Sequence, residues 1–152
     1  MLDSSLLRMP TVGMVDPHDP MWVSTLRAMG QELVTDSLVY RYDPSASPDG
    51  LAGSEGTFSL CTFAYVDALA RCDRVEEARL IFEKMLTYAN HVGLYSEEIA
   101  LTGEQIGNFP QAFTHLSLID AALTLDAHLD RAEGSNGVGP ASVPWAAGLQ
   151  LR

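Results

Sequence analysis

The chain has 152 residues, 47% of them hydrophobic, which fits one compact domain and is too short for two full enzyme domains. Its 9 Lys and Arg against 20 Asp and Glu give a formal net charge of −11 at pH 7. Such a charge argues against a nucleic-acid partner and against adsorption to an anionic membrane, because both depend on basic side chains. The composition therefore favours a ligand that is neutral or cationic.

The cysteines and the N-terminal residues indicate the cellular compartment and whether a metal site is expected. Cys61 and Cys72 are too few for a disulfide scaffold and lack the neighbouring Cys or His residues of a zinc site. The first residues lack the basic stretch and long apolar core of a signal peptide, and no window approaches the ~18 consecutive apolar residues of a membrane helix. We therefore expect a cytoplasmic protein that has no metal and no other cofactor.

The first predicted helix begins at Asp19-Pro20, because Asp can cap free amide groups and Pro fits the first helical turn. Its buried face consists of apolar residues at steps of four, three and four: Trp22, Leu26, Met29 and Leu33. The stretch 37–56 follows as a loop, since it is rich in Pro and Gly. A loop of this length inside a compact domain is usually functional or disordered.

Two helices of different character follow. Residues 57–71 are apolar around most of the helix circumference, which predicts burial on nearly all sides. Residues 73–76 look like a capping box and open a helix that extends to about Ala89, with apolar residues on one face only. A buried helix followed by an amphipathic one predicts two concentric layers, with inner helices around a core and outer helices facing water.

After a second irregular stretch, residues 90–108, Pro110 opens a fourth predicted helix that ends near Leu129. Its predicted buried stripe is Phe113, Leu116, Ile119 and Ala122 or Leu123. No strand alternation is visible anywhere in the chain. The sequence therefore predicts an all-α fold of helical hairpins over residues 1–132 and a flexible Gly/Pro-rich tail over 133–152.

Candidate functional residues are the polar side chains in or beside the two loops: Arg41, Asp49, Glu55, Glu97, Glu98, Gln111 and His115. Adjacent residues do not share a helix face, so at most one of Glu97 and Glu98 can point into a pocket. Arg41 can clamp a ligand hydroxyl or pair with a loop carboxylate, and His115 can be a core residue or a site residue. No nucleotide-binding or hydrolase motif is present, so these residues alone do not define a reaction.

Two strings near the second loop resemble the C-terminal signature of glycoside hydrolase family 15, which contains glucoamylases, glucodextranases and trehalases. They are Gly-Leu-Tyr-Ser-Glu-Glu at 93–98 and Gly-Asn-Phe-Pro-Gln-Ala-Phe-Thr-His at 107–115. Supporting segments occur in the family's order at 39–42, 55–58 and 66–79. The resemblance extends from Leu2 to about Leu129.

The resemblance implies part of an (α/α)6 barrel and an inverting hydrolysis of a terminal α-linked glucoside or glucan. That reaction needs a protonated acid and an ionised base roughly 6.5–9.5 Å apart, so that a water molecule fits between base and sugar. Glu97 matches the family's general base, and Arg41 matches an arginine that binds sugar hydroxyls. The resemblance implies binding or supporting roles for Glu55, Glu98, Gln111 and His115.

The family's general acid lies earlier, at a Trp-Glu pair, whereas neither Trp22 nor Trp145 precedes a Glu here. Since an acid or base each contributes about 10²–10⁴-fold, we expect the chain alone to be inactive. The open barrel edges would favour self-association or a partner. The alternative is a helical-repeat interaction module, because residues 68–78 resemble one tetratricopeptide-like hairpin, although no second copy follows at a period of about 34 residues.

Overall fold

The computed structural model describes residues 2–43 and 56–135. Its helical elements are the 3-10 helix η1 (Ser4–Arg8) and the α-helices α1 (Pro20–Glu32), α2 (Ser59–Arg71), α3 (Val75–Leu86) and α4 (Ala112–Ser135). Its strands are β1 (Val34–Thr35), β2 (Leu38–Val39), β3 (Thr57–Phe58), β4 (Glu98–Ile99) and β5 (Gln105–Ile106). The all-α class is confirmed. The strands were not predicted, because a two-residue strand is too short to show an alternating pattern.

The strands form two small antiparallel sheets, each next to the end or the beginning of a helix. In the first, β1 pairs with β2 directly after α1. In the second, β4 lies between β3 and β5, with Glu98 opposite both Phe58 and Ile106. Because β3 leads straight into α2, this second sheet fixes the loop around Glu98 at the beginning of that helix.

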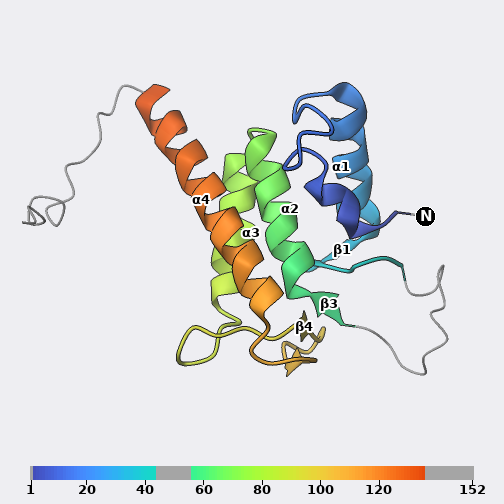
Figure 1. Ribbon diagram of the computed structural model, residues 1–152, viewed down its shortest axis with the longest axis vertical. Helices are drawn as coiled ribbons and strands as arrows, with labels where there is room; N and C mark the ends of the chain where they lie inside the picture. Colours follow the sequence, from blue (N-terminus) through green and yellow to red (C-terminus); the bar gives the residue numbers. More distant parts are fainter. Residues whose placement is uncertain (1, 44–55, 136–152) are drawn as a thin grey trace, which may run out of the picture.

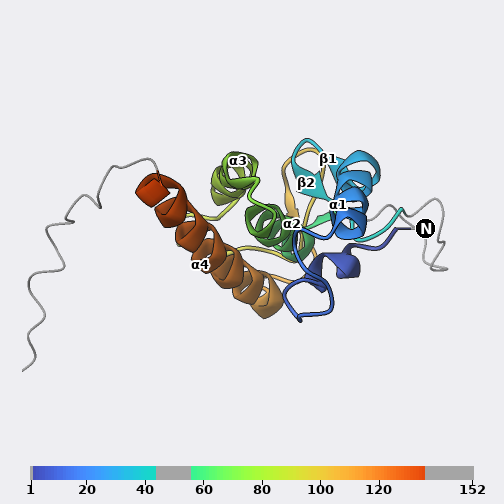
Figure 2. The ribbon, with the colours of Figure 1, turned by 90° about the horizontal axis from the view of Figure 1, so that it is seen from above.

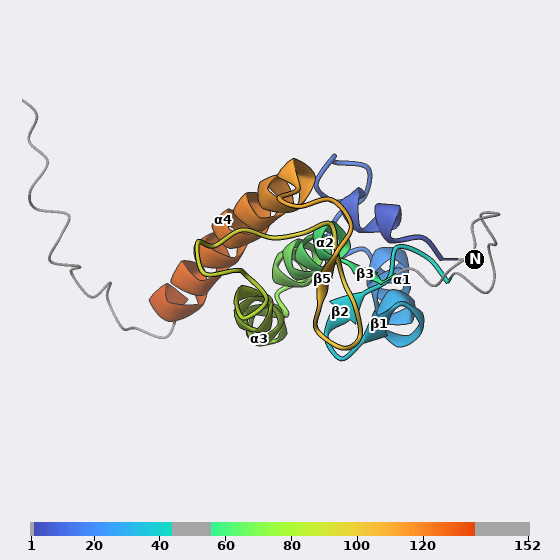
Figure 3. The ribbon, with the colours of Figure 1, turned by 90° about the horizontal axis from the view of Figure 1, so that it is seen from below.

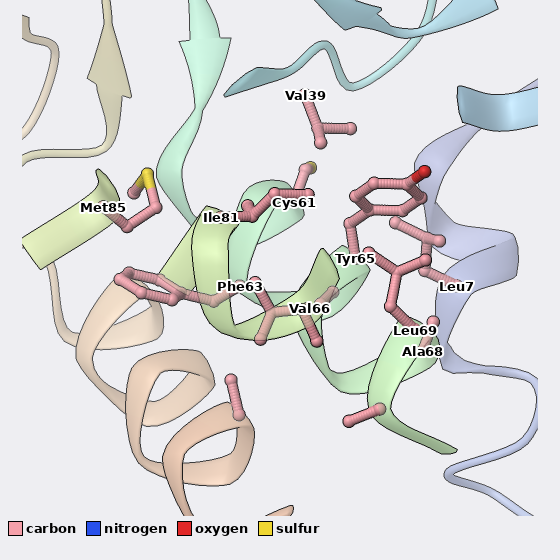
Figure 4. Packing of buried hydrophobic residues seen from close by; sticks show 14 of the residues in the cluster. Leu7, Val39, Cys61, Phe63, Tyr65, Val66, Ala68, Leu69, Ile81 and Met85 are labelled. Carbon is pink, nitrogen blue, oxygen red and sulfur yellow. The ribbon is translucent and has the colours of Figure 1, made fainter. Parts of the chain in front are cut away.

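Helix α2 is the centre of the molecule. All three views show it between the α3–α4 side and the α1–η1 side (Figures 1, 2 and 3). Eleven of its 13 residues are buried, which confirms the predicted inner helix. Figure 4 shows its side chains, among them Phe63, Val66 and Leu69, packed against residues such as Leu7, Ile81 and Met85 from η1 and α3.

Helix α1 begins where the sequence predicts. The side chain of Asp19 accepts hydrogen bonds from the backbone N–H groups of Met21 and Trp22, at 2.8 and 3.4 Å. The predicted face of this helix is the buried one: Trp22, Leu26, Met29 and Leu33 are each no more than 2% exposed. The capping residue and the spacing of the apolar residues therefore both predict this helix correctly.

Helix α3 is amphipathic, as predicted, but it begins and ends differently. The predicted capping box is wrong, because Arg74 occupies the N-cap position and no side chain caps the helix. Asp73 instead adopts a left-handed backbone conformation with φ +59°, and its carboxylate bonds the imidazole of His18 at 2.8 Å. The helix ends at Leu86, three residues before the predicted end.

The predicted buried stripe of α4 is wrong. Phe113, Leu116, Ile119 and Leu123 are 68%, 59%, 53% and 66% exposed, and the buried residues are Thr114, Ser117, Ala121 and Leu125. The two buried hydroxyls are satisfied by backbone carbonyls, Thr114 Oγ1 donating to Ser96 O and Ser117 Oγ to Leu60 O. Because these small polar residues can be buried once bonded, the helix packs through them and turns its large apolar side chains outward.

Within residues 2–43 and 56–135, no helix combines the length and hydrophobicity needed to cross a membrane. Helix α4 extends to Ser135, and the remainder of the predicted tail, residues 136–152, lies outside the described residues. Glu55 and Asp49 also lie outside them.

Candidate active site

A cavity of about 870 Å³ lies among η1, α2, α4 and the loop that precedes β4. Three of the predicted site residues line it: Arg41, Glu97 and Gln111. Arg41 and Glu97 are 56 positions apart in the sequence and reach the same cavity from different loops. Its apolar wall comes mainly from α2 and α4. Besides the three predicted residues, the lining consists of Asp3, Ser4, Ser5, Arg8, Phe58, Leu60, Cys61, Ala64, Phe113, Leu116, Ser117 and Asp120.

Glu97 is held by both its backbone and its side chain. Its N–H donates to Asn108 O at 2.9 Å, and its carbonyl accepts from the N–H of Ser59, the first residue of α2, at 2.9 Å. Its Oε2 accepts from the backbone N–H of Asn108 at 3.1 Å and from the Asn108 side-chain amide at 2.8 Å. These bonds fix the carboxylate at the cavity wall.

Gly107 leaves the space that this arrangement needs. Its φ is +77°, and a Cβ added there would lie 3.0 Å from both Cβ and Oε2 of Glu97. Only glycine adopts such a backbone conformation at little cost. The Gly-Asn pair that opens the second signature string therefore shapes the surroundings of Glu97.

Arg41 carries its guanidinium over aromatic rings. Its Cζ lies 5.7 Å from the ring centroid of Tyr42 and 6.0 Å from that of Phe58, which also lines the cavity. Its backbone carbonyl accepts from the N–H of Ser4 at 2.7 Å, so that the start of η1 anchors it. An exposed guanidinium stacked in this way keeps its N–H groups available to a hydroxyl ligand.

Gln111, Glu98 and His115 differ in where they lie. Gln111 lines the cavity, and its side-chain amide lies 2.8 Å from Thr114 Oγ1. Glu98 and His115 are not among the lining residues. Oε2 of Glu98 accepts from the N–H of Gly56 at 2.8 Å, and His115 bonds the backbone of the Glu97 loop and of its own helix. Both have contacts that suit support of the cavity wall.

Sequence reasoning missed part of the lining. Arg8 and Asp120, which form an ion pair at 3.4 Å across the cavity, come from η1 and α4. No motif marks them, and the packing of both η1 and α4 against α2 brings them together. Phe113 was assigned to a buried face, whereas it is an exposed aromatic wall of the cavity.

Cys61 also lines the cavity but is not a ready nucleophile. Burial raises the pKa of its thiol to about 11, and its Sγ accepts a hydrogen bond from Ser4 Oγ at 3.0 Å. A thiol in this state is protonated at neutral pH and therefore unreactive. In the parts of the chain that the structure describes, no group of three or more His, Cys, Asp and Glu side chains is arranged to hold a metal ion.

The sequence is similar to those of known proteins. It matches Glycosyl hydrolases family 15 over residues 1–123. It is 41% identical over 144 residues to the trehalases of Mycobacterium tuberculosis and Mycolicibacterium smegmatis, which covers 94% of this chain and 21% and 22% of those proteins. It is 40% identical over 126 residues to the trehalase of Thermoplasma acidophilum, covering 82% of this chain and 21% of that protein.

The chain therefore spans about a fifth of the length of these relatives. No solved structure matches it. The family match nevertheless includes both strings of the signature, the loop that carries Arg41 and the whole of α2 and α3. By this match the chain belongs to Glycosyl hydrolases family 15.

Proposed function

We propose that this chain is the base-bearing part of an inverting α-glucosidic hydrolase and that its Glu97 is the general base. The observation that carries the proposal is the single cavity onto which Glu97, Arg41 and Gln111 open. Trehalose is the first substrate to test, because the matched relatives are named trehalases. Maltose and isomaltose, the substrates of a glucoamylase-type activity, are the second.

In the proposed reaction, Glu97 takes a proton from a water molecule while the water oxygen forms a bond to the anomeric carbon. The bond from that carbon to the glycosidic oxygen breaks on the opposite face, and a separate carboxylic acid protonates the departing oxygen. Arg41 and Gln111 would bind hydroxyls of the terminal sugar. The resemblance assigns the acid to a Trp-Glu pair that is absent from this sequence, so we propose that the chain alone is inactive.

The outward face of α4 supports a larger assembly. Phe113 and Leu116 belong both to the cavity wall and to an exposed apolar stripe that continues with Ile119 and Leu123. A continuous apolar stripe of this kind marks an interface. Since this chain matches only about a fifth of the length of these relatives, we propose that the remaining hairpins of the family's barrel cover the stripe and close the cavity. This proposal takes precedence over self-association and over the helical-repeat alternative.

A chimera tests the assignment of Glu97. This chain would replace the matching fifth of the Mycolicibacterium smegmatis trehalase, and trehalose, maltose and isomaltose would be assayed. Glu97→Gln should lower turnover by about 10²–10⁴-fold, as expected for loss of a general base. Glu98→Gln is the matched control, because the adjacent carboxylate bonds Gly56 and does not line the cavity; it should retain most of the activity.

Chemical rescue by azide is a second test of Glu97 as the base in the same chimera. In Glu97→Ala, azide can bond to the anomeric carbon without losing a proton, so it should restore turnover and yield a glycosyl azide of inverted configuration. Turnover of Glu97→Gln equal to that of the unsubstituted chimera would refute the base assignment. The unmodified chain, assayed by itself, should hydrolyse none of the three substrates.

A further inference from the structure

The loop that carries Glu97 is fastened to the beginning of α4 at Tyr95, two residues earlier. The N–H of Gln111 donates to Tyr95 O at 3.1 Å, and the N–H of Tyr95 donates to Nε2 of His115 at 3.3 Å. The loop backbone is thus bonded in both directions to one turn of helix, and the imidazole supplies one of the two bonds. The resemblance implies a binding or supporting role for His115 but does not specify this bond to Tyr95.

The contacts of the ring define its protonation. Nδ1 of His115 lies 2.7 Å from the carbonyl oxygen of Gln111, which can only accept, so Nδ1 must carry the proton. Nε2 faces the Tyr95 N–H and must therefore present its lone pair. This arrangement requires the neutral imidazole with its proton on Nδ1, because a protonated ring has no acceptor for Tyr95.

Packing anchors the side chain of Tyr95, and its backbone bonds to the beginning of α4 add to the bonds that hold Glu97. The Tyr95 side chain is 2% exposed, and its ring meets those of Phe63 and His115 edge to face at centroid distances of 5.6 and 5.8 Å. The ring is therefore anchored in the core formed by α2. Between that anchor and Glu97, the backbone is bonded to residues 111–115 at the beginning of α4, through Tyr95 and Ser96.

We propose that His115 is a positioning residue for Glu97: its neutral imidazole accepts the Tyr95 N–H and thereby holds the loop in the register that places the Glu97 carboxylate on the cavity and in contact with Asn108. His115 does not touch the cavity and acts only through the Tyr95–Glu97 backbone. The significance of this positioning for catalysis rests on the proposed function. The positioning itself can be measured in the chain as it stands, without a substrate.

Two similar substitutions separate the roles of the two ring nitrogens. In His115→Gln, the side-chain oxygen reaches about as far as Nε2 and can still accept the Tyr95 N–H. In His115→Asn, the shorter side chain reaches only as far as Nδ1 and retains the contact within α4 alone. Both are polar and uncharged, so a difference between them reports on the Tyr95 bond rather than on the loss of an aromatic ring.

The readouts are amide signals of the full 152-residue chain labelled with nitrogen-15. In His115→Asn, hydrogen exchange of the Tyr95 amide should accelerate by about tenfold, the effect of losing one net hydrogen bond. The chemical shift of the Asn108 side-chain amide, which donates to Glu97 Oε2, should also move toward the value of an unbonded amide. His115→Gln should stay close to the wild type in both measurements, as a rescue by the variant that keeps the acceptor.

A measurement on the unsubstituted chain guards against a variant that fails to fold. Long-range proton–nitrogen correlation of His115 at neutral pH should reveal the tautomer with its proton on Nδ1, the less populated one in free histidine. The Nε2-protonated tautomer would overturn the proposal. So would His115→Asn behaving like His115→Gln at both Tyr95 and Asn108. Neither result depends on whether Glu97 is the general base, which the chimera tests separately.

Discussion

Helices α2 and α4 are neighbours in the fold, yet their surroundings differ. Eleven of the 13 residues of α2 are buried, including Phe63, Val66 and Leu69, which are fully inaccessible. Helix α4 buries one face against α2 and leaves large apolar side chains exposed on the other, among them Ile119 and Leu123. Both helices carry apolar residues on more than one face, but only α2 has neighbours for all of them.

This difference separates the residues that stabilise the chain by itself from those that we expect to contact the rest of a barrel. The described part of the chain itself buries most of α2, and this burial stabilises it. The outward face of α4 contributes little to that stability, because its side chains remain in contact with water. If the comparison is right, identical substitutions in the two helices should have very different effects.

The largest expected difference is between Leu69→Ala in α2 and Leu123→Ala in α4. Leu69 is fully buried, so the substitution should lower the free energy of unfolding by about 2–5 kcal/mol through lost burial and a cavity. Leu123 is 66% exposed, and its substitution should change that free energy by less than about 0.5 kcal/mol. Urea denaturation of the two variants and the wild type measures both quantities.

The same two variants also test what covers the exposed face of α4. Equal losses for Leu69→Ala and Leu123→Ala in the isolated chain would mean that Leu123 is buried in solution, for example between two copies. A loss for Leu123→Ala that grows with protein concentration would identify self-association directly. In the chimera with the remaining barrel, by contrast, Leu123→Ala should become clearly destabilising.

A smaller difference is expected near Glu97, between two glycines of nearly equal backbone conformation that lie before and after it in the sequence. Gly107 and Gly93 have φ of +77° and +79°, so replacing either with alanine should cost about 1–2 kcal/mol of backbone strain. Only at Gly107 would the added Cβ lie 3.0 Å from Glu97, since nothing lies within 4 Å of a Cβ at Gly93. Gly107→Ala should therefore also shift the Asn108 amide signals, and Gly93→Ala should leave them unchanged. Identical spectra for the two variants at Asn108 would show that Gly107 does not shape the Glu97 contact.

The sequence predicts the two kinds of helix well where burial pattern and capping residues agree. The spacing of Trp22, Leu26 and Met29 after Asp19 specifies α1, and the all-round apolar composition specifies α2. The signature string at 93–98 points to Glu97 and the supporting segment at 39–42 points to Arg41, and the structure places both on one cavity. That they are the base and a sugar-binding group remains a prediction.

The features that were mispredicted depend on contacts distant in the sequence. The buried face of α4 was misassigned because Thr114 and Ser117 look like exposed residues until the carbonyls of Ser96 and Leu60 are brought to them. Asp73 looks like a helix cap, but His18, 55 positions earlier, takes its carboxylate. Spacing within one helix carries no information about such partners.

The smallest predicted effect concerns this His18–Asp73 contact, which joins the segment before α1 to the turn between α2 and α3. The hydrogen bond to Asp73, with the added charge of Asp16, raises the pKa of His18 above its usual 6.5. Because the folded-state pKa is the higher one, the contact stabilises the fold fully below about pH 6.5 and loses this effect as the pH rises through the folded value. Wild type and His18→Gln should therefore differ in urea midpoint at pH 6 and converge by pH 9.

Comparison with His18→Gln is needed because His128, which lies 3.6 Å from the same carboxylate, titrates with the opposite sign. Burial, aided by Arg131 and Arg71, lowers the pKa of His128, so its protonation favours the unfolded chain as the pH falls. In the wild type, the effects of the two histidines on the pH dependence of stability partly cancel. The difference between wild type and His18→Gln therefore isolates the effect of His18. Both His18 and Asp73 are exposed, so this difference should be much smaller than that for Leu69→Ala. A midpoint difference that stayed constant from pH 6 to pH 9 would show that the contact does not depend on the charge of His18.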